Sequence, residues 1–150
     1  MTPEHSFTLA SIAAMVGWML LVGAALAPPG TARIRLLWAG GRLVPLLLSA
    51  AYLALLVSHW RSAPGGHFGS LDGVATLFAS RGKLAGGWVH FLAFDLFVGR
   101  WMIDDVLART APRWYLLPCL PLTFLYGPAG LLLYFALRPS RRLPPPKPDD

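Results

Sequence analysis

The sequence predicts an all-α integral membrane protein with four transmembrane helices and a short amphipathic helix between the second and the third. Two observations concern composition: 55% of the 150 residues are hydrophobic and only 13% are charged. A soluble domain carries about a quarter charged residues, and a chain of this length could not bury so much apolar surface in water. The third observation is a set of four apolar runs, each near the roughly 20 residues that cross a bilayer.

The first two predicted spans cover residues 7–27 and 43–60. No Asp, Glu, Lys or Arg occurs within residues 5–32, and Pro28-Pro29-Gly30 ends the first run because these residues cannot continue a helix. A secretory signal peptide is the rival interpretation, but the run lacks a basic start and its apolar part is too long. Pro45 falls in the first turn of the second run, where a missing N–H has no helical partner to lose.

The connection from residue 61 to residue 83 contains a short amphipathic pattern. Its apolar residues recur at i, i+3, i+4 and i+7, as on one face of a helix: Leu71, Val74, Ala75 and Phe78. Ser70 stands where a helix N-cap is expected. We expect a short helix at the membrane interface or against the bundle, with an ordinary surface loop as the alternative.

The third and fourth predicted spans cover residues 86–104 and 115–137. The third is apolar and aromatic but contains three groups that can carry charge: His90, Asp95 and Arg100. The fourth carries three prolines, Pro118, Pro121 and Pro128, so it cannot be a straight rod. We expect residues 1–138 to form a single four-helix membrane domain, followed by an extended, basic, proline-rich tail over residues 139–150.

The basic residues give an orientation. The net charge is +6, but Lys and Arg lie between and after the apolar runs, which favours topology signals over nucleic-acid binding. With four spans, both termini and the second loop share one side of the membrane, and that side holds the larger share of Lys and Arg. We therefore expect a multi-pass protein of the cell membrane with both termini in the cytoplasm.

The third span holds the strongest candidates for chemistry. Asp95 falls at its middle, where a carboxylate costs at least about 3 kcal/mol, so it should face the bundle interior. His90 projects about 140° away from Asp95 around the helix, so each needs its own partner on another span. Arg100 and Asp104 are spaced for an ion pair at the membrane edge. The alternative role for His90 and Asp95 is to hold helices together, and the alternative for Arg100 is to snorkel to the headgroups while Asp104 marks the helix exit.

A break in the fourth span is the natural neighbour for Asp95. Within Tyr126-Gly127-Pro128-Ala129-Gly130, Pro128 leaves the carbonyl of Phe124 without a donor, and the glycines allow close backbone approach. This break either faces Asp95 and helps to form a pocket, or is a kink that lets the helix pack. We expect no metal site and no cofactor, because no two of the four histidines lie at i, i+3 or i+4 and there is one cysteine.

Residues 88–101, Trp88-Val89-His90-Phe91-Leu92-Ala93-Phe94-Asp95-Leu96-Phe97-Val98-Gly99-Arg100-Trp101, resemble the signature of the abscisic-acid-deficient-four-like family. Ser70-Leu71-Asp72-Gly73-Val74, Pro118-Cys119 and residues 127–134 resemble it as well, so about half of the chain is covered. The resemblance implies a small four-helix membrane protein. Plant members lie in chloroplast membranes and are required to convert violaxanthin into neoxanthin, whereas many relatives come from bacteria that make no neoxanthin.

The family's step opens an epoxide without net redox change, so the resemblance implies an isomerase-like enzyme acting on a carotenoid or other isoprenoid lipid. His90 and Asp95 are the candidate acid and base, and Arg100 would stabilise negative charge. The predicted binding residues are aromatic or belong to the break: Trp88, Phe91, Phe94, Trp101, Tyr126, Gly127, Pro128 and Gly130. The alternatives are a non-catalytic membrane subunit that binds a lipid, pigment or partner protein, and a translocator; the latter would need a homo-oligomer.

Overall fold

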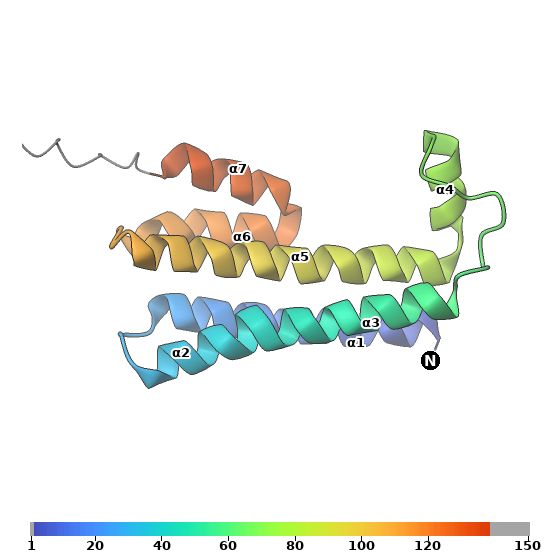
Figure 1. Ribbon diagram of the computed structural model, residues 1–150. Helices are drawn as coiled ribbons and strands as arrows, with labels where there is room; N and C mark the ends of the chain where they lie inside the picture. Colours follow the sequence, from blue (N-terminus) through green and yellow to red (C-terminus); the bar gives the residue numbers. More distant parts are fainter. Residues whose placement is uncertain (1, 139–150) are drawn as a thin grey trace, which may run out of the picture.

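Three long helical rods lie side by side and form the body of the molecule (Figure 1). The computed structural model describes residues 2–138. The rods are α1 (Pro3–Leu26), a second rod made of α2 (Thr31–Trp38), a π-helical turn (Ala39–Leu43) and α3 (Val44–Ser58), and α5 (Arg81–Ala108). The described regular elements are all helical, as predicted. Two segments are long and apolar enough to cross a membrane, α1 and the second rod.

The second rod begins twelve residues before the predicted span, because the helix already starts at Thr31. Pro45 has no N–H to donate to the carbonyl four residues earlier, yet the helix does not end there. Instead, the helix adopts the π-helical turn just before Pro45. The wider hydrogen-bonding pattern of that turn accommodates the N–H that proline lacks. At that turn Gly40 touches α1 so closely that a Cβ atom would lie 2.7 Å from the carbonyl oxygen of Gly17.

The short helix α4 (Leu71–Ala79) forms where the pattern predicts it. The hydroxyl of Ser70 accepts a hydrogen bond from the N–H of Gly73 at 3.1 Å, which is the expected N-cap. The buried face is nevertheless different from the predicted stripe, because α4 buries Gly73 and Leu77 and leaves Leu71 85% exposed. Gly73 lies against His67 and Leu77 against Gly66, so this face packs on the preceding loop.

The fourth predicted span is wrong as a single crossing. Residues 115–137 contain two helices, α6 (Leu116–Tyr126) and α7 (Pro128–Leu137), and the chain reverses between them (Figure 1). Gly127 adopts a φ of 35°, which favours glycine, and Pro128 begins the new helix. α7 then runs back along α6, where Gly130 lies against the backbone of Thr123. The segment is a helical hairpin.

This hairpin changes where the chain leaves the bundle. Arg138, at the end of α7, donates to Asp105 near the end of α5 at 3.0 Å. The N-terminus lies at the other end of the rods (Figure 1). The first and the last described residues therefore lie at opposite ends of the rods, whereas four crossings would have brought them to the same end. The predicted tail over residues 139–150 lies outside the described residues.

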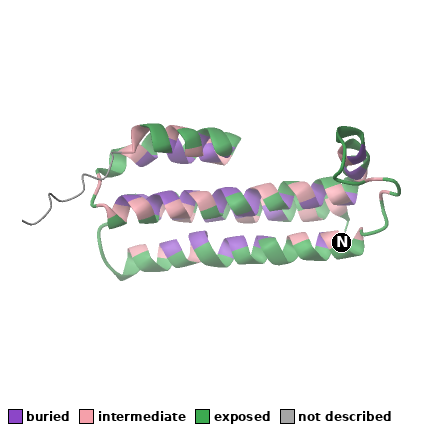
Figure 2. Ribbon diagram, turned by 45° about the horizontal axis from the view of Figure 1, so that its top comes forward, coloured by how far each residue is buried: buried purple, intermediate pink, exposed green. Residues whose placement is uncertain are grey.

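The core lies along the inner faces of the rods, with α5 at the centre. Figure 2 shows buried residues on the faces that meet and exposed residues on the outward faces. Among the fully buried side chains are Leu21 of α1, Leu96 and Met102 of α5, and Tyr134 of α7. α5 thus contacts the other two rods and the hairpin, and it carries the three predicted catalytic residues.

Candidate functional site

The three predicted catalytic residues all lie on α5 but do not converge. His90 and Arg100 face the second rod at separate places, at Tyr52 of α3 and at Leu37 of α2, whereas Asp95 faces the turn between α6 and α7. Residues on one helix rotate by about 100° each, so spacings of five residues cannot align them. The structure does not bring the three groups into one site.

His90 lies at the edge of the best-formed cavity. Its ring is stacked on Phe94 at 4.6 Å and tilted against Tyr52 at 5.4 Å, measured between ring centroids. The cavity has a volume of about 550 Å³ and lies between α3, the following loop, α4 and the first half of α5. Large apolar side chains form most of its walls: Tyr52, Leu56, Trp60, Phe68, Leu77 and Phe78.

The wall that α5 contributes has an unusual composition. Lys83, Gly86, Gly87 and His90 follow one another at i, i+3, i+4 and i+7, so they share one face of the helix. A Cβ atom at Gly86 would meet no atom closer than 3.9 Å, whereas one at Gly87 would lie 2.6 Å from the Phe78 ring. The pair of glycines therefore leaves room for a methyl group beside α3 at one position and admits α4 closely at the other.

Asp95 lies in closed surroundings. Its side chain is 7% exposed, and a Cβ atom on Gly127 would lie 2.5 Å from its Oδ1 atom. Its Oδ2 atom is buried and has no hydrogen-bond partner among residues 2–138. The carboxyl group is thus packed directly against the hairpin turn, and the predicted break contacts Asp95 without leaving a pocket-sized gap at Gly127.

Arg100 has partners that explain its place without a ligand. Its Nε atom donates to Asp104 at 2.7 Å, and its Nη1 atom donates to the carbonyl oxygen of Leu37. Its aliphatic part lies on Gly41 of the π-helical turn. Arg100 therefore joins α5 to the second rod near the edge of the apolar region.

The predicted binding residues lie on other faces. The indole of Trp88 donates to Ser11 at 3.1 Å, Phe94 is exposed beside His90, and Trp101 packs on Tyr134. None of the predicted binding residues lines the cavity that holds His90: Trp88, Phe91, Phe94, Trp101, Tyr126, Gly127, Pro128 and Gly130. The sequence shows that aromatic residues surround α5, but it does not indicate which face of this helix lines a cavity.

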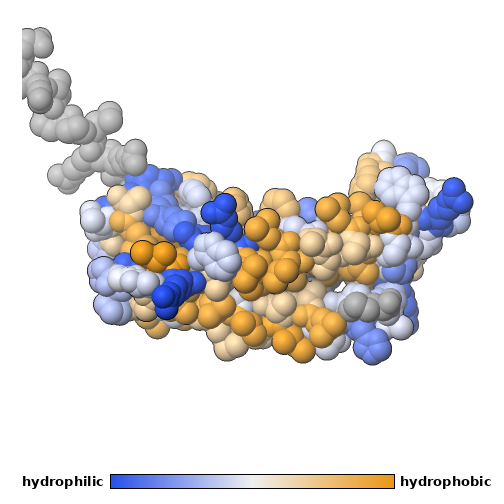
Figure 3. Space-filling model, turned by 60° about the horizontal axis from the view of Figure 1, so that its bottom comes forward, coloured by the Kyte–Doolittle hydropathy of each residue, from blue (hydrophilic) through white to orange (hydrophobic). Residues whose placement is uncertain are grey.

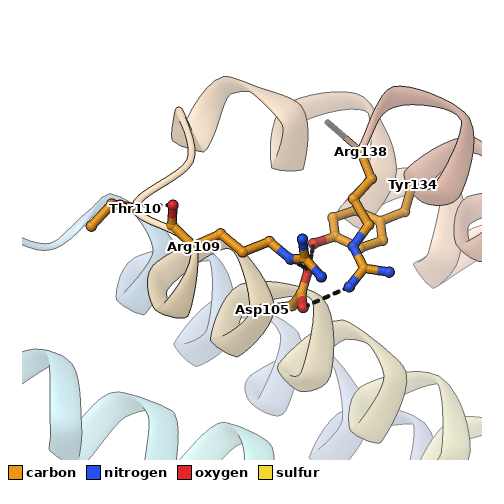
Figure 4. A network of polar contacts seen from close by, with 5 residues as sticks. All are labelled: Asp105, Arg109, Thr110, Tyr134 and Arg138. Atoms are coloured by element: carbon orange, nitrogen blue, oxygen red, sulfur yellow. Dashed lines mark hydrogen bonds and ion pairs between the residues drawn. The ribbon is translucent and has the colours of Figure 1, made fainter. Parts of the chain in front are cut away.

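Sequence reasoning missed a polar cluster around Asp105 (Figure 4). Its carboxylate accepts from Arg109 at 2.8 Å, from the Tyr134 hydroxyl at 2.7 Å and from Arg138 at 3.0 Å. Asp105 lies past the predicted span of residues 86–104. Burial raises the pKa of its carboxyl group, but these hydrogen bonds outweigh burial and hold the pKa below its usual value. The cluster fastens α7 to α5.

Only part of this cluster has a sequence signal. Arg109 follows Asp105 at i+4, which is a readable helical pair. Tyr134 and Arg138 come from the hairpin, and nothing in their spacing points to Asp105. Within residues 2–138 no group of three His, Cys, Asp or Glu side chains is arranged to hold a metal ion.

Residues 5–134 match the family described as ABA DEFICIENT 4-like. The chain belongs to this family. It is similar to "Protein ABA DEFICIENT 4, chloroplastic" of Arabidopsis thaliana, with 27% identity over 100 residues, or 62% of this chain and 44% of that protein. The chain thus spans less than half the length of this relative. No solved structure matches the chain.

The ABA DEFICIENT 4-like match covers both regions described above. The His90 cavity and the contact of Asp95 with Gly127 lie within residues 5–134, while Arg138 lies beyond them. The resemblance seen in the sequence is therefore confirmed at the level of the family.

Proposed function

We propose that this member of the ABA DEFICIENT 4-like family is an integral membrane protein that binds a carotenoid or related isoprenoid lipid. Support for a membrane comes from the outward faces of the rods. Large apolar side chains are exposed there on all three, including Met19, Leu46 and Phe97. Figure 3 shows hydrophobic residues across the middle of the molecule and hydrophilic ones towards its ends. A belt of this kind suits a bilayer.

The hairpin gives the proposal a definite orientation. Three rods would cross the membrane, and α6 and α7 would enter and leave on one side. The end of α5 carries most basic residues near the bundle ends: Arg33, Arg35, Arg109, Arg113 and Arg138. The other end has fewer: Arg61, Arg81 and Lys83. By the positive-inside rule the end of α5 faces the cytoplasm of a cell membrane, and the N-terminus lies outside.

Cysteine labelling in intact cells tests this orientation. An impermeant maleimide should label Pro64→Cys in the outer loop before lysis and Thr110→Cys only after the cells are opened. Both positions are exposed. Labelling of Thr110→Cys in intact cells, with Pro64→Cys protected, would contradict the orientation.

The ligand site is the cavity beside His90. The observation that carries this assignment is a space of about 550 Å³ with aromatic walls, a glycine-lined floor and one of the predicted acid–base residues at its edge. Apolar pockets with a few convergent polar groups are the usual form of small-molecule sites. The family relation supplies the ligand class, a carotenoid or related isoprenoid.

Isomerisation of the ligand is a second candidate function. The position of His90 at the cavity favours a mechanism in which one residue acts as both base and acid. Because Asp95 lies elsewhere, His90 would remove an allylic proton from carbon and return it to the other end of the double bond. The proton balances, and no electron is gained or lost overall. Binding without reaction is the simpler role of the same cavity.

Filling the cavity tests the site. The probe is all-trans-retinol, whose binding to purified protein can be followed by energy transfer from tryptophan, because Trp60 lines the cavity. Gly86→Leu should weaken retinol binding at least about tenfold, since Gly86 lines the cavity and a larger side chain there would take up part of its volume. Gly23→Leu on α1 is the matched control, because a Cβ atom there also has room, with 3.8 Å to Leu36. Unchanged binding to Gly86→Leu would refute the site.

His90→Gln separates reaction from binding. The amide fills a similar space but cannot exchange a proton near neutral pH. If the protein isomerises its ligand, this variant should bind retinol normally and lose product formation in a carotenoid-producing host. Normal product formation by His90→Gln would rule out His90 as the reacting group, and binding would be the remaining role of the cavity.

A further inference from the structure

The polar groups of the cavity share one electrostatic character. Among the lining residues are one lysine, two histidines and one tyrosine, Lys83, His67, His90 and Tyr52, and there is no Asp or Glu. Each of these four side chains can donate a hydrogen bond. The cavity therefore suits a ligand whose polar end carries acceptor oxygens, and above all a negative charge.

Lys83 has no counter-charge of its own within residues 2–138, because no carboxylate oxygen lies within 4.0 Å of its ammonium group. The acidic groups on the elements packed near it are accounted for or turned elsewhere. Glu4 of α1 pairs with Arg81 at 2.8 Å. Asp72 of α4 is exposed in the first turn and does not line the cavity. Lys83 is half-buried and lines the apolar cavity, so its ammonium group is available to an anion that enters the cavity.

The spacing along α5 gives the ligand a direction. Lys83 and His90 are seven residues apart on one face, which is about 10 Å along the helix axis. Between them Gly86 and Gly87 line the cavity without side chains of their own, and the Phe78 ring lies against Gly87. Trp60 borders the same cavity with aromatic surface. Lys83 and His90 therefore stand at the two ends of an apolar wall of the cavity.

We propose that the cavity selects an isoprenoid with an anionic end, a carboxylate or a phosphate, which Lys83 binds while the chain lies along Gly86 towards His90. This inference rests on the proposed function only in placing an isoprenoid in this cavity. It narrows the ligand class, because a neutral carotenoid would leave the Lys83 charge unused.

Matched acid and alcohol probes test the selection. The full-length protein in detergent is titrated with all-trans-retinoic acid and with all-trans-retinol, and separately with geranylgeranyl phosphate and geranylgeraniol. Wild-type protein should bind at least one anionic probe about tenfold more tightly than the alcohol of the same chain. The pair that shows the preference distinguishes a carboxylate from a phosphate.

The variants assign the preference to one residue. Lys83→Gln should remove the tenfold preference for the anionic probe over its alcohol, whereas Lys83→Arg should retain it. Arg81→Gln is the matched control, since Arg81 lies two residues away on the surface and does not line the cavity. Equal binding of acid and alcohol by wild type, or an equal loss in Arg81→Gln, would overturn this inference while leaving the site intact. Failure of every probe to bind would overturn the proposed function as well.

Discussion

The regions beside the two ends of α5 are packed differently, and a glycine marks each. Near its start, Gly86 has room for a methyl group, since an added Cβ would lie 3.9 Å from the nearest atoms of α3. Near its end, the hairpin of α6 and α7 packs on the helix, and within that hairpin a Cβ on Gly130 would lie 2.3 Å from the backbone nitrogen of Thr123. The absent side chain therefore makes room for a ligand in one region and for another segment of backbone in the other. A glycine count alone could not separate these roles.

The largest expected effect comes from adding one methyl group to each of these glycines. Gly130→Ala forces backbone apart in the hairpin and should lower the free energy of unfolding by about 3 kcal/mol or more. Gly86→Ala has room and should raise it by up to about 1 kcal/mol, because alanine favours a helix. Thermal unfolding in detergent measures both. Equal losses would show that the two halves are closed alike.

A smaller loss is expected when the hairpin is unfastened. Asp105 is 15% exposed and accepts from three side chains, so Asp105→Asn should cost about 2–4 kcal/mol. Asp104→Asn is the control, because Asp104 is 48% exposed and holds one partner, Arg100; it should cost at most about 1 kcal/mol. Retinol binding should stay unchanged in both variants. A parallel loss of binding would mean that the hairpin shapes the cavity.

The smallest effect is expected at Asp95. Its Oδ2 atom lacks a partner among the described residues, and a neutral amide is easier to bury than a carboxylate. Asp95→Asn should therefore keep retinol binding and raise the free energy of unfolding by about 1 kcal/mol. A folded Asp95→Asn variant that binds retinol but forms no product would move the reactive group from the cavity to the hairpin.

The comparison also shows what the sequence could predict. The rods, α4 and its Ser70 cap follow from apolar runs, spacing and one hydroxyl, all of which act locally. The reversal at Gly127 was visible as a break, but its direction depends on how Gly130 meets Thr123. Residues 115–137 are long enough to cross a bilayer, so length favoured a span where packing produced a hairpin.

The candidate site was harder to predict for a related reason. Helical geometry already separated His90 from Asp95, and the structure extends that separation to Arg100. The cavity forms where α3 and α4 pack near α5, and no short sequence pattern predicts which residues of these helices meet. Gly86-Gly87 between Lys83 and His90 was not recognised in the sequence, although its spacing marks one helix face with little side chain.

Photo-crosslinking tests the central claim most directly, namely that the isoprenoid site lies at the α4 end of α5. A diazirine-bearing retinyl probe is irradiated with the purified protein, and the modified peptides are identified by mass spectrometry. We predict adducts in the segments that contain Tyr52, Trp60 and Phe78, and their loss in Gly86→Leu. Adducts confined to residues 116–137, unchanged by Gly86→Leu, would contradict the account and place the ligand at the hairpin.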